Sequence, residues 1–352
     1  MSDTLLKEPR LGASHHLGRV WRSGRHLVPV LTLVLVVFMI FAVTNPVFLS
    51  SGNLQLLLTS NAQLWVIAIG MTFVMVAGNV DLSVGALVAF LAVLFGKLLD
   101  AGVSGGVALT ITLVVGALIG GLVNGVLIGR LGLSFLLVTL ASLTLFTGLV
   151  NLWSDTMAIP VQSPITDFIA FGNFLGVNVS LWIMAGTFIV AQLIQSRTYF
   201  GRDVYAVGGN RQAARLAGIN TERTIVLVFA LTGLAAAVAA VIGIGRTGAA
   251  SPTIDNNVPL EAIAAVLLGG SSIAGGSGGV GGTALGVLFL ATLANGLSLS
   301  QISSFWQQVV TGVILVSAVL FNRMGADGSL KRWLGHLRGR HADAGATSNS
   351  DA

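Results

Sequence analysis

Residues 27–48, LVPVLTLVLVVFMIFAVTNPVF, decide the class of fold. The stretch contains no charged residue and is long enough to cross a bilayer, which takes about 17 to 25 apolar residues. A secretory signal has an apolar core of only about 7 to 15 residues and ends in small residues. This stretch is longer and runs into Thr44-Asn45-Pro46. We therefore interpret it as an uncleaved first membrane span.

Further apolar stretches of bilayer length follow along the chain, so that about ten spans are predicted in total. Apart from the first, they cover residues 62–79, 82–99, 106–129, 133–153, 180–196, 224–245, 258–275, 279–298 and 303–322. The glycines between residues 269 and 282 interrupt the helical pattern. Either two helices or a broken, re-entrant pair would fit there. Because non-helical backbone at membrane depth needs protein or a water-filled cavity around it, this region is a candidate lining of a pathway.

The composition agrees with lipid as the main solvent of the chain. Of the 352 residues, 54% are hydrophobic and only 9% are charged, and the mean hydropathy is +0.90. Soluble domains carry about 25% charged residues, so this chain could not cover a globular surface with polar groups. A soluble enzyme and a nucleic-acid-binding domain are thereby excluded. The predicted fold class is all-α, a polytopic membrane bundle of about ten transmembrane helices with a glycine-rich broken or re-entrant region.

The positively charged residues predict the orientation in the membrane. Most of the 18 Lys and Arg residues fall in three segments, residues 1–26, 197–223 and 323–352. Because short segments rich in Lys and Arg stay in the cytoplasm, both termini and the 197–223 loop are predicted to be cytoplasmic. Six predicted spans precede this loop and four follow it. An even number of crossings returns the chain to the same side of the membrane, so the predicted spans agree with the orientation predicted from charge. The predicted organisation is a basic tail (1–26), a transmembrane domain (27–322) and a second basic, partly disordered tail (323–352).

The sequence offers no residues for catalysis, for a metal or for a cofactor. It has no cysteine, and its five histidines all lie outside the predicted spans. No G-x-x-x-x-G-K-[ST] motif occurs, so any energy from ATP would have to come from a partner. The G-x-G-x-x-G matches at 243–248 and 276–281 lack the strand and the acidic residue that dinucleotide binding needs. An intramembrane enzyme is therefore disfavoured, as is a proton-coupled transporter, which places carboxylates or histidines within its spans.

The 197–223 loop contains a candidate docking helix. Asn210 can N-cap a short helix over 211–217, and Gly218 lies just after its end, where glycine is favoured. Its arginines would share one face, and its alanines would form a small, closely approachable surface. The residues concerned are Arg211 and Arg215, and Ala213, Ala214 and Ala217. Such a helix suits docking into another protein and equally suits lying on anionic lipid headgroups, so both interpretations stay open.

Asp81 is the clearest ionisable residue beside a predicted span. It lies in GNVDLSVG, residues 78–85, between two apolar stretches. Charged groups at membrane depth are expensive and usually functional. Alternatively, Asp81 before Leu82 could cap the free N–H groups of the following helix. Both interpretations are open and both can hold, because the capped end of a half-helix often borders a substrate path.

Three stretches of the chain resemble one family of membrane proteins. They are AGNVDLSVGALVAF (77–90), YAVGGNRQAARLAGIN (205–220) and EAIAAVLLGGSSIAGGSGGVGGTALG (261–286). These stretches are similar to those of the permease subunits of ATP-binding-cassette (ABC) sugar importers, in the ribose, xylose and galactose branch. The likeness covers residues 35–325. The three stretches follow one another in the same order as in the family, and the basic loop has the same position.

The resemblance implies a multi-pass permease subunit in the bacterial inner membrane. Its implied partners are a cytoplasmic ABC ATPase, a periplasmic sugar-binding protein, a second permease copy forming a homodimer, and membrane lipid. The 205–220 loop would then be the coupling helix that docks on the ATPase. The docking residues would be Asn210, Arg211, Ala213, Ala214, Arg215, Leu216, Ala217 and Gly218.

The implied function is translocation of a simple sugar, that is, a pentose, a hexose or a related polyol. A polar but uncharged path suits such a neutral solute. The candidate pathway residues are Asp81, Ser83, Asn124, Thr292 and Asn295. A permease for branched-chain amino acids and, less favoured, a secondary transporter are the alternatives.

Overall fold

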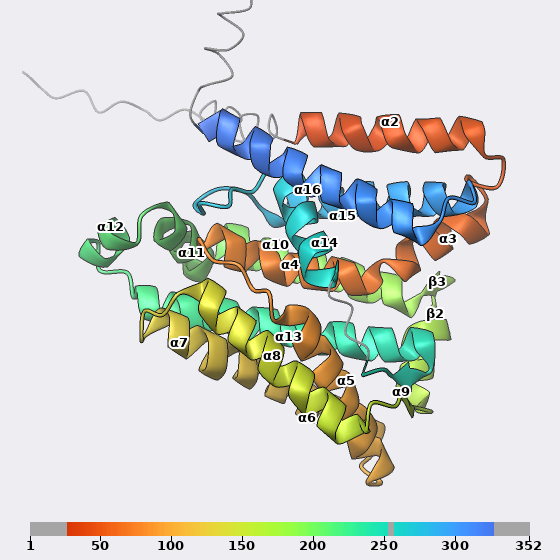
Figure 1. The fold of residues 1–352 in the computed structure, drawn as a ribbon, viewed down its shortest axis with the longest axis horizontal. Coiled ribbons are helices and arrows are strands. Elements are labelled where there is room, and N and C mark those ends of the chain that lie inside the picture. The colour runs from red at the N-terminus through yellow and green to blue at the C-terminus, as the bar shows by residue number, and fades with distance from the viewer. Residues whose placement is uncertain (1–26, 253–256, 327–352) are drawn as a thin grey trace, which may run out of the picture.

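The computed structural model describes residues 27–252 and 257–326, most of which are helical (Figure 1). The first helices are α2 (Val28–Thr44), α3 (Ser51–Ser60), α4 (Ala62–Val76), α5 (Val84–Asp100), α6 (Gly105–Leu118), η1 (Ile119–Gly125), α7 (Val126–Gly129) and α8 (Phe135–Ser154). The later ones are α9 (Pro164–Phe171), α10 (Val179–Arg197), α11 (Tyr199–Gly209), α12 (Arg211–Leu216), α13 (Thr221–Thr247), α14 (Asn257–Leu268), α15 (Val280–Leu299) and α16 (Ser304–Ala326). Each predicted span coincides over most of its length with helix, so the helical fold is confirmed.

Several of these helices can cross a membrane. In the described part of the chain, five spans are long and apolar enough by themselves: the continuous α6–η1–α7, and α8, α10, α13 and α15. Helices α3 and α4, which meet at an angle of 44°, bring the number to six if they form one bent span. Helices α2 and α14 and residues Phe305–Ser317 of α16 are shorter apolar helices. A multi-pass helical membrane protein is thus confirmed, whereas the count of about ten crossings stays a prediction.

The glycine-rich region forms a loop between two helices. Helix α14 ends at Leu268 and α15 begins at Val280, so the predicted continuation of a span to residue 275 is wrong. The backbone explains the difference, because four glycines of the loop have φ between +72° and +114°, which a right-handed helix does not allow. They are Gly270, Gly275, Gly276 and Gly278.

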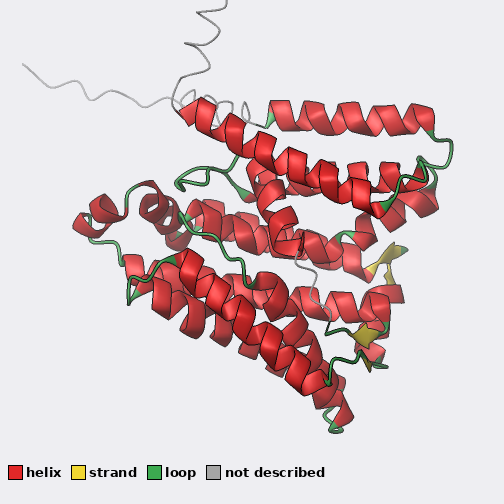
Figure 2. Ribbon diagram, in the orientation of Figure 1, coloured by secondary structure: helices red, strands yellow, loops and turns green. Residues whose placement is uncertain are grey.

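Short strands occur at the end of the molecule that lies opposite α12 (Figure 2). β1 (Ile159–Pro160) pairs antiparallel with β4 (Ala249–Ala250), which ties the segment after α8 to the segment after α13. β2 (Asn173–Phe174) and β3 (Val177–Asn178) form a small hairpin between α9 and α10. Each strand has two residues, so helices carry the fold.

Helix α13 is the central element, and small residues let it pack closely. It contacts α4, α5, α6 and η1. A Cβ atom at Gly233 would overlap the carbonyl oxygen of Gly116, and one at Gly120 would overlap that of Phe229. Without a hydrophobic driving force between helices in lipid, close backbone approach of this kind supplies the packing energy.

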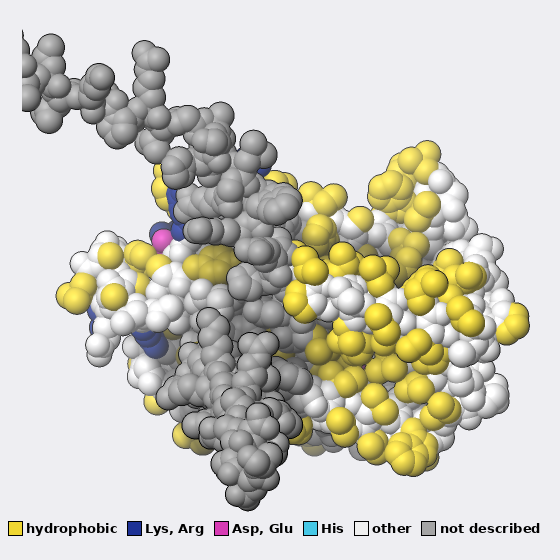
Figure 3. Space-filling model, turned by 90° about the horizontal axis from the view of Figure 1, so that it is seen from above, with side chains coloured by type: hydrophobic (Ala, Val, Ile, Leu, Met, Phe, Trp, Pro, Cys, Tyr) yellow, Lys and Arg dark blue, Asp and Glu magenta, His cyan; other side chains and the backbone are white. Residues whose placement is uncertain are grey.

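The surface matches a protein embedded in lipid. Helix α2 buries none of its residues, and Val43 is 80% exposed. In Figure 3 the visible charged side chains lie toward the end that carries α12, and hydrophobic and neutral side chains cover the opposite end. The predicted tails 1–26 and, apart from the end of α16, 323–352 lie outside the described residues.

Candidate functional site

A buried polar network joins three of the predicted pathway residues. The Ser83 hydroxyl donates to Asp81 Oδ1 at 2.6 Å, and Asn124 Nδ2 donates to the Ser83 hydroxyl at 2.8 Å. Ser142 of α8 completes the network by donating to Asn124 Oδ1 at 2.6 Å. The four side chains are all buried. The network therefore links the start of α5 to η1 and α8.

Asp81 precedes α5 without capping it. The helix begins at Val84, and the Asp81 carboxylate accepts a hydrogen bond from the Ser83 N–H at 2.9 Å. This hydrogen bond forms an Asx turn ahead of the helix. The Asp81 carboxylate therefore accepts no hydrogen bond from the N–H groups of the first helical turn. The predicted cap is wrong because the helix begins at Val84 instead of Leu82. Asp81 is 1% exposed and satisfied by Ser83, so its role in a pathway stays a prediction.

Thr292 and Asn295 belong to a different part of the bundle. Asn295 of α15 and Asn53 of α3 exchange two amide hydrogen bonds, both 3.0 Å long. Asn53 also donates to the carbonyl oxygen of Phe48 at 2.9 Å. Thr292 is buried on α15. The predicted pathway residues thus form two groups, and Asn295 links helices, as amides often do in membranes.

Replacing Asn124 by leucine should destabilise the protein by about 1 to 3 kcal/mol, because Ser142 would lose its acceptor in a buried place. Thermal unfolding of the detergent-purified protein measures the effect. The matched control is Asn151→Leu, since Asn151 is exposed on α8. Equal melting temperatures for the two variants would contradict a structural role of the network.

The local prediction for the 197–223 loop is confirmed. Asn210 Oδ1 accepts a hydrogen bond from the Ala213 N–H at 2.9 Å, which caps α12. Gly218 has φ +82°, the left-handed conformation that ends a helix and favours glycine. Arg211 donates to the carbonyl oxygen of Gly129 at 2.8 Å and so fastens α12 to the end of α7.

The exposed surface of α12 differs from the predicted one. Ala214 is only 5% exposed and packs into the core, so its inclusion in the approachable alanine surface is wrong. Leu216 is 90% exposed, and Ala213 and Ala217 are exposed as well. Arg215 forms an ion pair with Glu222 at 2.8 Å. The outward face therefore combines one large apolar side chain with small residues and an arginine.

Glycines join α11, which leads into α12, to two other parts of the bundle. The N–H of Gly276, in the loop between α14 and α15, donates to the carbonyl oxygen of Val76 at the end of α4 at 2.8 Å. A Cβ atom at Gly208 of α11 would overlap that same oxygen and lie 2.7 Å from the Gly276 nitrogen. We call this contact of Val76, Gly208 and Gly276 the glycine junction. It places α11 directly against α4 and the α14–α15 loop.

Two side chains that the sequence analysis did not single out support the glycine junction. The Tyr205 hydroxyl donates to the carbonyl oxygen of Gly278 at 2.6 Å, and Gln195 Oε1 accepts from the N–H of Val280 at the start of α15. Burial raises the pKa of the Tyr205 hydroxyl, which keeps it protonated as a donor. No sequence signal marks these contacts, since each joins residues far apart in the chain. Only Tyr205 lies within a stretch that carried the resemblance.

The described residues hold no metal-binding cluster. Within residues 27–252 and 257–326, no group of three or more His, Cys, Asp or Glu side chains could hold a metal ion. What the fold presents is a multi-pass helical bundle with a short, exposed helix attached to its packed core. Fold and site thus define a multi-pass helical membrane protein with an exposed cap-and-glycine-bounded helix, α12.

The comparisons agree with this class. The pattern of the family described as "Branched-chain amino acid transport system / permease component" matches residues 53–319. The chain belongs to this permease family. No solved structure matches the chain.

Several relatives are similar along most of the chain. The ribose import permease protein RbsC of Bacillus subtilis is 40% identical over 84% of this chain and 92% of its own length. The probable ABC transporter permease protein YphD of Escherichia coli is 39% identical, over 85% of this chain and 90% of its own. The L-arabinose transport system permease protein AraH of Escherichia coli is 33% identical over 88% of this chain and 93% of its own length.

Proposed function

We propose that this chain is the permease subunit of an ABC importer that carries a simple sugar across the bacterial inner membrane. The relatives named for ribose and L-arabinose support the sugar as cargo. The observation that carries the proposal is the glycine junction, through which the α11–α12 segment touches α4 and the α14–α15 loop. A partner that moves α12 would thereby move elements of the transmembrane bundle.

The partners follow from this assignment. A cytoplasmic ABC ATPase docks on α12, a periplasmic sugar-binding protein delivers the cargo, and a second copy of the chain completes the channel. In this proposal the chain crosses the membrane about ten times. Both termini and α12 lie in the cytoplasm, as the distribution of Lys and Arg predicts. The docking residues Asn210 to Gly218 act as one surface, with Leu216 at its centre and Ala214 holding the helix from behind.

Reconstitution tests the proposed function. The chain is inserted into proteoliposomes with its ATPase, and uptake of radiolabelled D-ribose, L-arabinose, D-xylose, D-galactose and L-leucine is measured with and without ATP and the binding protein. We expect uptake of a sugar that needs both ATP and the binding protein. Uptake of leucine alone would support the amino-acid alternative suggested by the family description. Uptake driven by an ion gradient without ATP would support a secondary transporter.

A further inference from the structure

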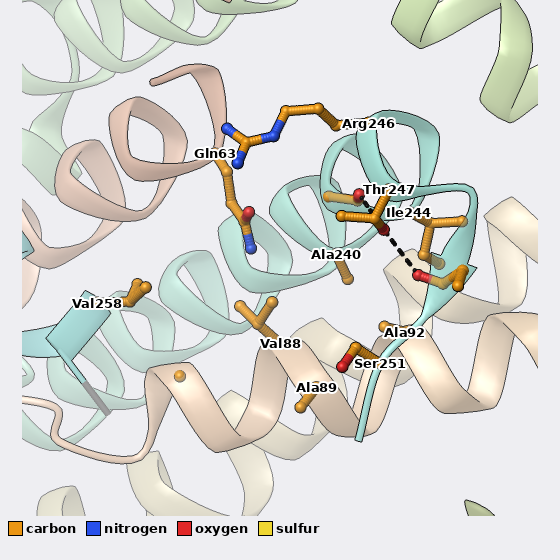
Figure 4. A pocket seen from close by; sticks show the side chains of 13 residues that line it. Gln63, Val88, Ala89, Ala92, Ala240, Ile244, Arg246, Thr247, Ser251 and Val258 are labelled. Atoms are coloured by element: carbon orange, nitrogen blue, oxygen red, sulfur yellow. Dashed lines mark hydrogen bonds between the residues drawn. The ribbon is translucent and has the colours of Figure 1, made fainter. Parts of the chain in front are cut away.

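A cavity of about 190 Å³ lies between α4, α5 and α13, at the end of α13 that is far from α12 (Figure 4). Val88 and Ala89 of α5 form one wall, and Gly243 of α13 forms another. The pairing of β1 with β4 holds the segment that closes the cavity beyond Thr247. Its volume is below the ~300 to 1,000 Å³ of pockets for drug-sized ligands. It therefore suits one small molecule.

The polar groups of the cavity come from two helices. Figure 4 shows Gln63 of α4 and the guanidinium of Arg246 of α13 close to each other at one side of the cavity. Arg246 uses one nitrogen to donate to the carbonyl oxygen of Ser60 at 2.6 Å, which holds the guanidinium in place. The other N–H groups of a guanidinium, which has five, are available to a ligand.

Gln63 is placed to select a ligand. Its amide lies over Gly243, where a Cβ atom would come within 3.2 Å of Gln63 Oε1. No hydrogen bond joins the Gln63 amide to the other cavity residues drawn in Figure 4. An amide offers both a donor and an acceptor, and each hydroxyl of a sugar is also both. The apolar wall of Val88 and Ala89 suits the C–H face of a sugar ring.

We propose that this cavity binds a single neutral monosaccharide as it enters the permease, with Gln63 and Arg246 hydrogen-bonding its hydroxyl groups. The proposal rests on the proposed function, because the cavity faces the periplasm only if α12 is cytoplasmic. Helix α13 begins beside α12 at Thr221 and ends beside the cavity at Thr247, so the two sites lie at opposite ends of one helix. A sugar released by the binding protein would thus meet the cavity first.

Two substitutions test the cavity. Ala89→Leu fills it, and Gln63→Leu removes the amide while keeping a side chain of similar size. The matched controls are Ala141→Leu, at an exposed alanine of α8, and Gln308→Leu, at an exposed glutamine of α16. Each protein is reconstituted with the ATPase and the sugar-loaded binding protein, and the amount of labelled sugar imported per ATP hydrolysed is measured with the four sugars named above.

We expect Ala89→Leu and Gln63→Leu to lower sugar imported per ATP at least tenfold, while binding-protein-stimulated ATP hydrolysis and both controls stay within twofold of the wild type. If Ala89→Leu fails to fold, Gln63→Leu decides by itself. Normal import by Gln63→Leu, or an equal loss in the controls, would overturn the cavity proposal. If the wild type imports none of the four sugars, the proposed function is overturned instead.

Discussion

Leu216→Glu is expected to weaken binding of the ATPase subunit to this permease strongly. Leu216 is 90% exposed on α12, at the centre of the proposed docking surface. A hot-spot side chain near the centre of an interface contributes about 2 kcal/mol or more, which corresponds to about a 30-fold change in Kd, and we take Leu216 to be such a residue. Glutamate would add the cost of burying an unpaired charge. We therefore expect a loss of affinity of at least about 30-fold.

A pull-down of the ATPase from co-expressing membranes, followed by a Kd measurement in detergent, tests this expectation. The matched control is Leu175→Glu, because Leu175 is 79% exposed in the β2–β3 turn at the opposite end of the molecule. Leu216→Met should retain binding, since it keeps an apolar side chain of similar size. If Leu216→Glu binds the ATPase as tightly as Leu175→Glu, the docking assignment of α12 fails and the lipid-headgroup interpretation returns.

Gly208→Ala is expected to damage the glycine junction, whereas Gly209→Ala is expected to leave it intact. The Cβ atom at Gly208 would overlap the carbonyl oxygen of Val76 and crowd the Gly276 N–H, which donates to that oxygen. At Gly209 a Cβ atom has nothing within 4 Å. Overpacking of this kind usually costs about 1 to 3 kcal/mol. The neighbouring glycines therefore form a matched pair.

Thermal unfolding and sugar uptake, measured on both variants, separate stability from coupling. Gly208→Ala should melt at a lower temperature and import less sugar per ATP, while still binding the ATPase through the unchanged face of α12. Gly209→Ala should resemble the wild type in all three measurements. Equal behaviour of the two variants would show that the junction neither stabilises the fold nor transmits movement.

The fold class was predictable because its signal is compositional. A chain with 54% hydrophobic and 9% charged residues can only satisfy its backbone in lipid by forming helices or a closed barrel, and the long apolar stretches decide for helices. The end of α14 at Leu268 was less accessible, because apolar residues and glycines continue beyond it. The positive φ at Gly270 stops the helix, and the Gly270 and Ser271 N–H groups donate back to the carbonyl oxygens of Leu267 and Val266.

The sequence by itself determined α12, since its cap at Asn210 and its end at Gly218 depend on neighbouring residues alone. Tertiary structure alone decided that Ala214 faces the core and Leu216 the outside, because which face of a short helix is buried depends on what it packs against. The same holds for Asp81, Ser83 and Asn124, which the fold brings together, and for Asn295, which it pairs with Asn53. Local hydrogen bonds are encoded within a few residues, whereas contacts between helices exist only once the bundle has assembled.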